Sequence, residues 1–106
     1  MKLAIIIPVY NAEETIKRAI LSVDTSVPYE IICINDGSTD QTQHVLTELQ
    51  QKYPHIKVIH QSNQGAARSR NVGLEAMSED VDAFLFLDAD DEFFPSRIDL
   101  MVDAFN

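Results

Sequence analysis

The chain has 106 residues, which is enough for one compact domain and too short for two. Apolar residues make up 45% of the sequence, so the chain can build a hydrophobic core and lacks the composition of a disordered protein. The formal net charge of -9 excludes DNA and RNA as partners, because a nucleic-acid binder needs clustered Lys and Arg to replace counterions.

The first strand and helix are predicted near the N-terminus. Residues 3–7 form a continuous apolar, β-branched run, which indicates a strand buried on both faces and ended by Pro8. Asn11 is expected to open a helix, with Glu14 in the capping-box position. The side of this helix that faces the core carries apolar residues at helical spacing, namely Ile16, Ala19, Ile20 and Val23.

Two more strand–helix pairs follow. Residues 30–34 and 56–59 are short, largely apolar runs that predict the second and third strands. The turn at 36–40 leads into a helix whose core-facing stripe consists of Val45, Leu46, Leu49 and Tyr53. A third helix is predicted over about 66–77.

The chain ends with a strand and a helix. Residues 83–87 are all apolar and predict a fourth strand, followed at once by Asp88. Pro95 is expected at the first position of a last helix, whose core-facing stripe consists of Ile98, Met101, Val102 and Phe105. Alternating strands and helices imply right-handed crossovers. The predicted fold class is therefore α/β, an open, mainly parallel Rossmann-like sheet with helices on both faces.

Three polar segments follow predicted strands, at residues 8–11, 36–40 and 88–91. The carboxyl ends of parallel strands lie at one edge of a sheet, and ligands of open α/β sheets bind at that edge. Segments far apart in the sequence are therefore expected to converge on a single site.

The acidic run Asp88-Ala89-Asp90-Asp91 is the first candidate for chemistry. Asp88 and Asp90 are expected to face one site, because alternate residues that leave a strand point the same way. Carboxylates held close together repel each other unless a cation lies between them, and oxygen ligands suit Mg²⁺ or Mn²⁺. The alternative is a solvated acidic turn that caps the last helix.

Asp36 and Tyr10 are candidates for recognition of a nucleobase. Capping of a helix explains Ser38-Thr39-Asp40 but not Asp36, whose carboxylate can accept a hydrogen bond from the imide of a uracil-like base. Tyr10 can stack on such a base or simply pack against its own loop. Arg70 can bind diphosphate or ribose oxygens, or form a surface ion pair.

Four segments, taken together and in this order, resemble the family 2 glycosyltransferases of the GT-A fold. They are Ile5-Ile6-Ile7-Pro8-Val9-Tyr10-Asn11, Asn35-Asp36-Gly37-Ser38-Thr39-Asp40, Asn63-Gln64-Gly65 with Arg70-Asn71-Val72-Gly73, and Leu87-Asp88-Ala89-Asp90-Asp91. The resemblance covers nearly all of the chain. It implies that residues 1–106 form a single nucleotide-diphospho-sugar-binding domain, the N-terminal portion of a longer enzyme.

The resemblance also implies roles for individual residues. Asp36 would read the base, in a pocket lined by Pro8 and Tyr10. Asp90, with Asp88, would hold Mn²⁺ or Mg²⁺ at the donor's diphosphate, and Asp88 or Asp91 would lie near the ribose or sugar. The implied reaction is inverting transfer from a nucleotide-diphospho-sugar, most often a UDP-sugar, to an unknown saccharide, lipid or protein acceptor.

The sequence departs from the family pattern in two places. Asn35 stands where the family often has a first Asp. The general base of the family lies well beyond the D-x-D motif, and no residue up to Asn106 matches it, so the catalytic residue is not identified. The chain alone is therefore expected to bind donor without turnover. The alternative is a non-catalytic nucleotide-sugar-binding module. A phosphoacceptor receiver domain would need an acid pair after its first strand, which residues 8–11 do not supply.

Cysteine content and the fourth strand bear on the setting of the protein. Cys33 is the single cysteine, so no intramolecular disulfide can form. A reducing cytoplasmic location, peripheral to the membrane, is the expectation. The unpaired outer edge expected for residues 83–87 predicts self-association.

Overall fold

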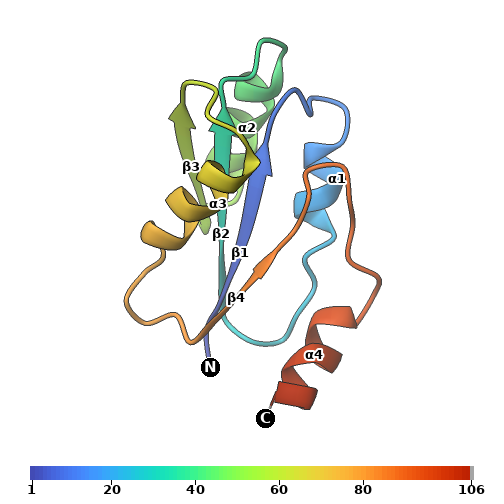
Figure 1. The fold of residues 1–106 in the computed structure, drawn as a ribbon. Helices are drawn as coiled ribbons and strands as arrows, with labels where there is room; N and C mark the ends of the chain where they lie inside the picture. The colour runs from blue at the N-terminus through green and yellow to red at the C-terminus, as the bar shows by residue number, and fades with distance from the viewer. Residues whose placement is uncertain (106) are drawn as a thin grey trace.

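The computed structural model describes residues 1–105, and Asn106 lies outside the described residues. They form one four-stranded sheet in the order β3-β2-β1-β4, and every pair of neighbouring strands is parallel (Figure 1). The elements in chain order are β1 (Leu3–Val9), α1 (Ile16–Leu21), β2 (Tyr29–Asp36), α2 (Thr42–Lys52), β3 (Ile56–Gln61), α3 (Ala66–Glu75), β4 (Ala83–Phe86) and α4 (Arg97–Phe105). The predicted open parallel α/β fold is confirmed.

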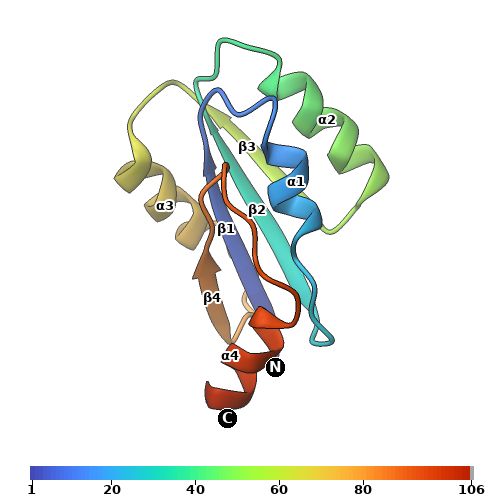
Figure 2. The ribbon, with the colours of Figure 1, turned by 90° about the vertical axis from the view of Figure 1, so that its right-hand side faces the viewer.

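Helices cover both faces of the sheet, as predicted (Figure 2). The larger apolar cluster lies on the face covered by α1, α2 and α4, and includes the predicted stripes of the first two helices. The smaller cluster lies under α3 and is centred on Ala4, Ile6, Ile32 and Ile34. Within residues 1–105, no helix combines the length and the apolar composition needed to span a bilayer.

β1 is longer than the sequence indicated, and the prediction that Pro8 ends its ladder is wrong. Pro8 pairs with Ile34 of β2. The carbonyl of Ile6 accepts a hydrogen bond from the Leu87 N–H at 3.0 Å, so alternate residues of β1 turn their backbone polar groups towards β4. The nitrogen of Pro8 therefore faces the β4 side, where the ladder has already ended at Ile6. The missing proline N–H thus leaves no strand partner unpaired.

The loop after β1 also differs from the prediction. α1 begins at Ile16, and Asn11 does not form a capping box with Glu14. Asn11 has a left-handed φ of 47°, which does not fit the start of a helix. Its Oδ1 accepts a hydrogen bond from the Thr39 N–H at 2.8 Å, and its own N–H donates to Ser38 Oγ at 3.0 Å. These bonds tie the loop after β1 to the loop after β2.

The last helix begins later than predicted. Ser96 has a left-handed φ of 63°, so a right-handed helix cannot run through it from Pro95, and α4 begins at Arg97. The prediction that Phe105 belongs to the core-facing stripe is also wrong, because its side chain is 70% exposed.

β4 lies at the edge of the sheet formed by residues 1–105. Leu85 packs against the larger cluster. Phe84 and Phe86 lie on the opposite face, beside Ala4 and Ile6, and remain 44% and 42% exposed. Their rings contact each other edge to face with centroids 5.4 Å apart. The strand therefore presents two exposed aromatic side chains as well as a free backbone edge.

A buried carboxylate lies among the amino-terminal parts of the strands, away from the polar segments. Glu30 of β2 is 4% exposed and accepts hydrogen bonds from Lys57 Nζ at 3.3 Å and the Ser78 N–H at 3.1 Å. Lys2 Nζ lies 3.3 Å from its other oxygen. Burial opposes ionisation of Glu30, but the bonds from Ser78 and the two lysines prevail and lower its pKa to about 2.

Candidate functional site

The three polar segments meet at the carboxyl edge of the sheet, as predicted. There they surround a cavity of about 420 Å³, which α3 also lines. Six of the seven predicted site residues line it, namely Pro8, Tyr10, Asp36, Arg70, Asp88 and Asp90. Asp91 is not part of this lining. The edge of one sheet thus gathers side chains from four separate parts of the sequence.

Asp36 is the most buried acidic group of the cavity, with 4% of its surface exposed. Its Oδ1 accepts hydrogen bonds from Gln61 Nε2 at 2.9 Å and the Gln64 N–H at 2.7 Å. Its Oδ2 accepts one from the Gly65 N–H at 3.0 Å. Burial acts to raise the pKa of Asp36, but these three hydrogen bonds outweigh it and lower the pKa. The carboxylate is therefore ionised at neutral pH and acts only as an acceptor.

The segment from Gln61, the last residue of β3, to Gly65 wraps around Asp36. Asn63 Nδ2 donates to the backbone carbonyl of Asp36 at 3.1 Å. Gly37 has a φ of 72°, and a Cβ built on it would lie 2.6 Å from the Asn63 backbone nitrogen. Only glycine fits both this conformation and this close approach. The loops after β2 and β3 are consequently locked together beside the cavity.

The acidic run forms a tight turn, in which the Asp91 N–H donates to the Asp88 carbonyl at 3.0 Å. The turn, and not continued strand alternation, brings the acidic side chains together. One carboxylate oxygen from each of Asp88, Asp90 and Asp91 lies within 4.8 Å of the others, and all three side chains are exposed. Three close oxygen donors fit a hard divalent cation such as Mg²⁺ or Mn²⁺.

Arg70 faces the acidic turn across the cavity. Its Nη2 lies 3.9 Å from Asp88 Oδ1, and its guanidinium lies over the ring of Phe86 with 5.8 Å to the centroid. Gly73, one turn later on α3, allows this placement. A Cβ there would lie 2.4 Å from Ile6 Cγ2, so glycine lets the helix pack directly on β1.

Four residues that line the cavity lie outside the segments that the sequence singled out, namely Ala12, Thr15, Ala66 and Ser69. Ser69 is fully buried, and its Oγ donates to the Gly65 carbonyl at 3.0 Å and accepts from Gln61 Nε2 at 3.2 Å. A serine three positions into a helix gives no distinctive pattern. Cys33, by contrast, is the buried core residue that the sequence indicated, and burial raises its pKa to about 12.

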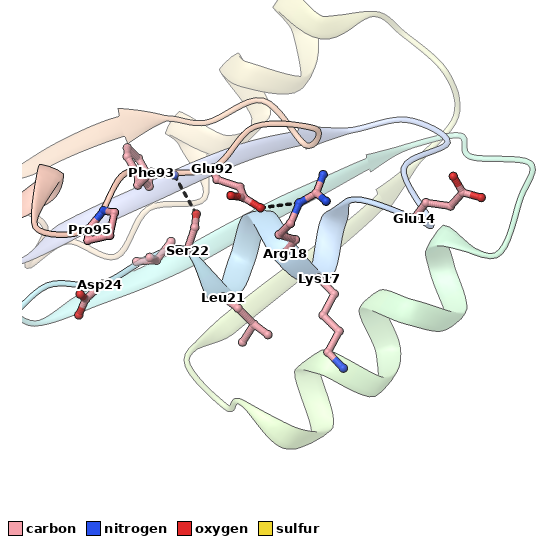
Figure 3. Close-up of a pocket in the computed structure, with 10 residues that line it drawn as sticks. Glu14, Lys17, Arg18, Leu21, Ser22, Asp24, Glu92, Phe93 and Pro95 are labelled. Atoms are coloured by element: carbon pink, nitrogen blue, oxygen red, sulfur yellow. Dashed lines mark hydrogen bonds and ion pairs between the residues drawn. The ribbon is translucent and has the colours of Figure 1, made fainter.

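A second, larger hollow of about 780 Å³ lies along α1 and the segment after the acidic turn (Figure 3). None of the predicted site residues lines it. Arg18 forms an ion pair with Glu92 there, and the Phe93 N–H donates to Ser22 Oγ at 3.0 Å. These two contacts attach the chain just after the acidic turn to α1.

Residues 4–106 match the protein family described as Glycosyl transferase family 2. The chain belongs to this family. Its relatives include the uncharacterized glycosyltransferase YibD of Escherichia coli (strain K12), which is 39% identical over 103 residues. That match covers 95% of this chain and 29% of YibD. The chain thus spans about a third of its relative's length.

Solved structures share the fold of this family 2 chain. S. aureus TarS 1-349 in complex with UDP superimposes with a TM-score of 0.83 at 28% identity, covering 97% of this chain and 31% of that one. The mannosyltransferase PcManGT from Pyrobaculum calidifontis, in complex with GDP-Man and Mn2+, has a TM-score of 0.70 at 22% identity, covering 92% of this chain and 30% of that one. The latter likeness concerns the fold alone.

Proposed function

We propose that this chain binds the nucleotide-diphospho-sugar donor, a UDP-sugar, of an inverting glycosyltransferase. The observation that carries the proposal is the single cavity that gathers Pro8, Tyr10, Asp36, Arg70, Asp88 and Asp90 at the carboxyl edge of the sheet. Membership of family 2 supports sugar transfer as the chemistry. The UDP bound by S. aureus TarS 1-349, at 28% identity, supports uracil as the donor base.

The base would bind at the Asp36 end of the cavity. Asp36 is ionised and buried, so it can accept a hydrogen bond from a base N–H where water competes weakly. Tyr10 is 52% exposed and lines the same cavity, so its ring is free to stack on the base beside Pro8.

The diphosphate would bind at the other end, between Arg70 and the acidic turn. Asp90 and Asp88 would hold Mn²⁺ or Mg²⁺, and Asp91 would lie near the sugar or complete the oxygen set. When bound, such a cation supplies charge neutralisation at the leaving diphosphate. Arg70 would contribute a guanidinium that is already held 3.9 Å from Asp88 and can pair with phosphate oxygens.

We further propose that residues 1–106 are the N-terminal donor-binding domain of a longer GT-A enzyme. The carboxylates of the cavity are all assigned to the donor, which leaves none to act as the general base. The chain alone would therefore bind donor without turnover. The acceptor would be a saccharide, a lipid or a protein. The free thiol of Cys33 supports a reducing, cytoplasmic location.

Calorimetry with UDP tests the proposal. In Mn²⁺, UDP should bind at one site, and replacing the metal with EDTA should weaken binding strongly. Uridine, which lacks the diphosphate, should bind weakly and show no dependence on Mn²⁺. Lack of UDP binding under both conditions would refute the donor function, whereas equal affinity under both would refute only the metal role.

A further inference from the structure

The hydrogen bonds of Asp36 leave little room for a ligand. An ionised carboxylate has about four acceptor positions, two on each oxygen. Gln61 Nε2 and the Gln64 N–H occupy both positions on Oδ1, and the Gly65 N–H occupies one on Oδ2. The side chain therefore retains one acceptor position, on Oδ2, and it has no proton to donate.

We propose that Gln61 is a specificity-determining residue, which selects bases that present a ring N–H without an adjacent amino group, by occupying the second oxygen of Asp36. The inference rests on the donor function proposed above, and it extends that function from recognition of the base to rejection of the wrong base. Gln61 lies directly opposite Asp36 in the β2–β3 register, so the amide is held on the carboxylate by the sheet itself. Its Nε2 also donates to the buried Ser69 Oγ, which fixes the amide from a second side.

The chemistry of the bases explains the selection. Uracil and hypoxanthine present one ring N–H beside a carbonyl, which a single acceptor position satisfies. Guanine presents a ring N–H and an adjacent amino group, a pair that matches both oxygens of a carboxylate. With Oδ1 of Asp36 already occupied, the amino group of guanine is left desolvated without a partner, which weakens binding roughly ten- to hundredfold.

Binding of nucleoside diphosphates to the purified chain tests the inference without any substitution. In Mn²⁺, inosine diphosphate should bind roughly ten- to hundredfold more tightly than GDP. These two ligands differ only by the amino group, so ring size does not enter the comparison. Equal affinity would overturn the inference and leave the UDP-sugar proposal standing. Binding of UDP with no measurable binding of either purine would also overturn it, because ring size would then make the selection. Failure of UDP itself to bind would overturn both.

A variant tests the role of Gln61 directly. Q61A vacates one position on Asp36 Oδ1, so the preference for inosine diphosphate over GDP should shrink to about threefold or less. N63A is the matched control, because Asn63 binds the backbone carbonyl of Asp36 and leaves the carboxylate's acceptors unchanged. N63A loosens the same loop and should keep the wild-type preference. An unchanged preference in Q61A, or an equal loss in both variants, would overturn the role of Gln61.

Discussion

The backbone N–H of Gly65 donates to Asp36 Oδ2 across 3.0 Å, although the two residues are 29 positions apart in the sequence. Gly65 directly precedes α3 and has a φ of 94°, and no side chain of its own segment caps the helix. Asp36 therefore supplies from β2 an acceptor for the N–H of the N-cap residue itself, which in a capping box would come from a side chain in the first turn of the helix. The carboxylate is thus a structural group of the fold as well as a candidate ligand of the base.

The first prediction concerns this structural role. Asp36→Ala should lower the free energy of unfolding by about 1–3 kcal/mol, because it leaves the Gln64 and Gly65 N–H groups without their acceptor. Urea denaturation would measure the change. Asp91→Ala removes an exposed acid near the same cavity and should change stability by less than about 0.5 kcal/mol. Equal stabilities of the two variants would contradict the structural role.

The second prediction concerns the metal. Asp90→Ala should reduce the affinity for UDP in Mn²⁺ to the value measured in EDTA, without unfolding the domain, because Asp90 is exposed in the turn beyond β4. Calorimetry would measure the affinity and circular dichroism the fold. Asp103→Ala removes the same charge from an exposed position on α4 and should leave the metal effect intact. A metal effect that survives in Asp90→Ala would exclude this aspartate as a ligand.

The third prediction concerns acid stability. The pKa of Glu30 is lowered from 4.5 to about 2 in the folded chain, so folding favours the ionised form. The resulting stability, about 3 kcal/mol, is fully present above the unfolded pKa and is lost as the pH falls from about 5 towards 2. Urea denaturation at several pH values should show a shallower loss for Glu30→Gln than for the wild type. The slope that remains in Glu30→Gln includes Asp36, whose pKa is also lowered. Parallel curves would show that Glu30 does not carry the effect.

The fourth prediction concerns the packing of α3. A Gly→Ala change inside a helix usually stabilises it, by about 1 kcal/mol. At Gly73 the new Cβ would lie 2.4 Å from Ile6 Cγ2 and 3.0 Å from Ile34 Cδ1, so Gly73→Ala should instead destabilise the chain by about 1–3 kcal/mol. Displacement of α3 should also weaken UDP binding through Arg70. A melting temperature equal to or above that of the wild type would show that the contact relaxes freely.

The fifth prediction is self-association through β4. Its backbone edge is free within residues 1–105, and the exposed rings of Phe84 and Phe86 lie beside it. Free strand edges and exposed apolar side chains both favour pairing with another copy. Light scattering should detect association that rises with concentration, and F84K/F86K should suppress it. A wild-type chain that stays monomeric at high concentration would contradict the prediction.

Most of the fold could be predicted from the sequence, because the strands and helices differ in their hydrophobic periodicity. The apolar run of β1 and the stripe of α1 are set by local sequence and by burial. The errors lie at the junctions. Asn11 is a good N-cap residue by type, yet the hydrogen bonds to Ser38 and Thr39 hold it in a left-handed conformation. Likewise, α4 begins after Ser96, because Ser96 has a left-handed backbone conformation that could not be predicted from the sequence.

The candidate site could be predicted in outline for a different reason. The carboxyl ends of parallel strands lie at the same edge of a sheet, so acidic and aromatic residues that follow these strands are expected to lie close together. Asp36, Asp88 and Tyr10 do line one cavity. The partners of Asp36 could not be predicted, because two of them are backbone N–H groups and the third is Gln61, a polar residue at a strand end. Every residue except proline has a backbone N–H, so the amino-acid sequence does not show which of these groups will bind Asp36.

The attachment of the acidic turn at both ends has a kinetic consequence. The Leu87 N–H is bonded to β1 just before the turn, while Glu92 and Phe93 are bonded to α1 just after it. A turn fixed in this way has little conformational entropy left to lose when a ligand arrives. The time course of diphosphate binding to the turn should therefore be a single exponential. Its observed rate constant should rise linearly with ligand concentration, without the plateau that a slow loop closure imposes.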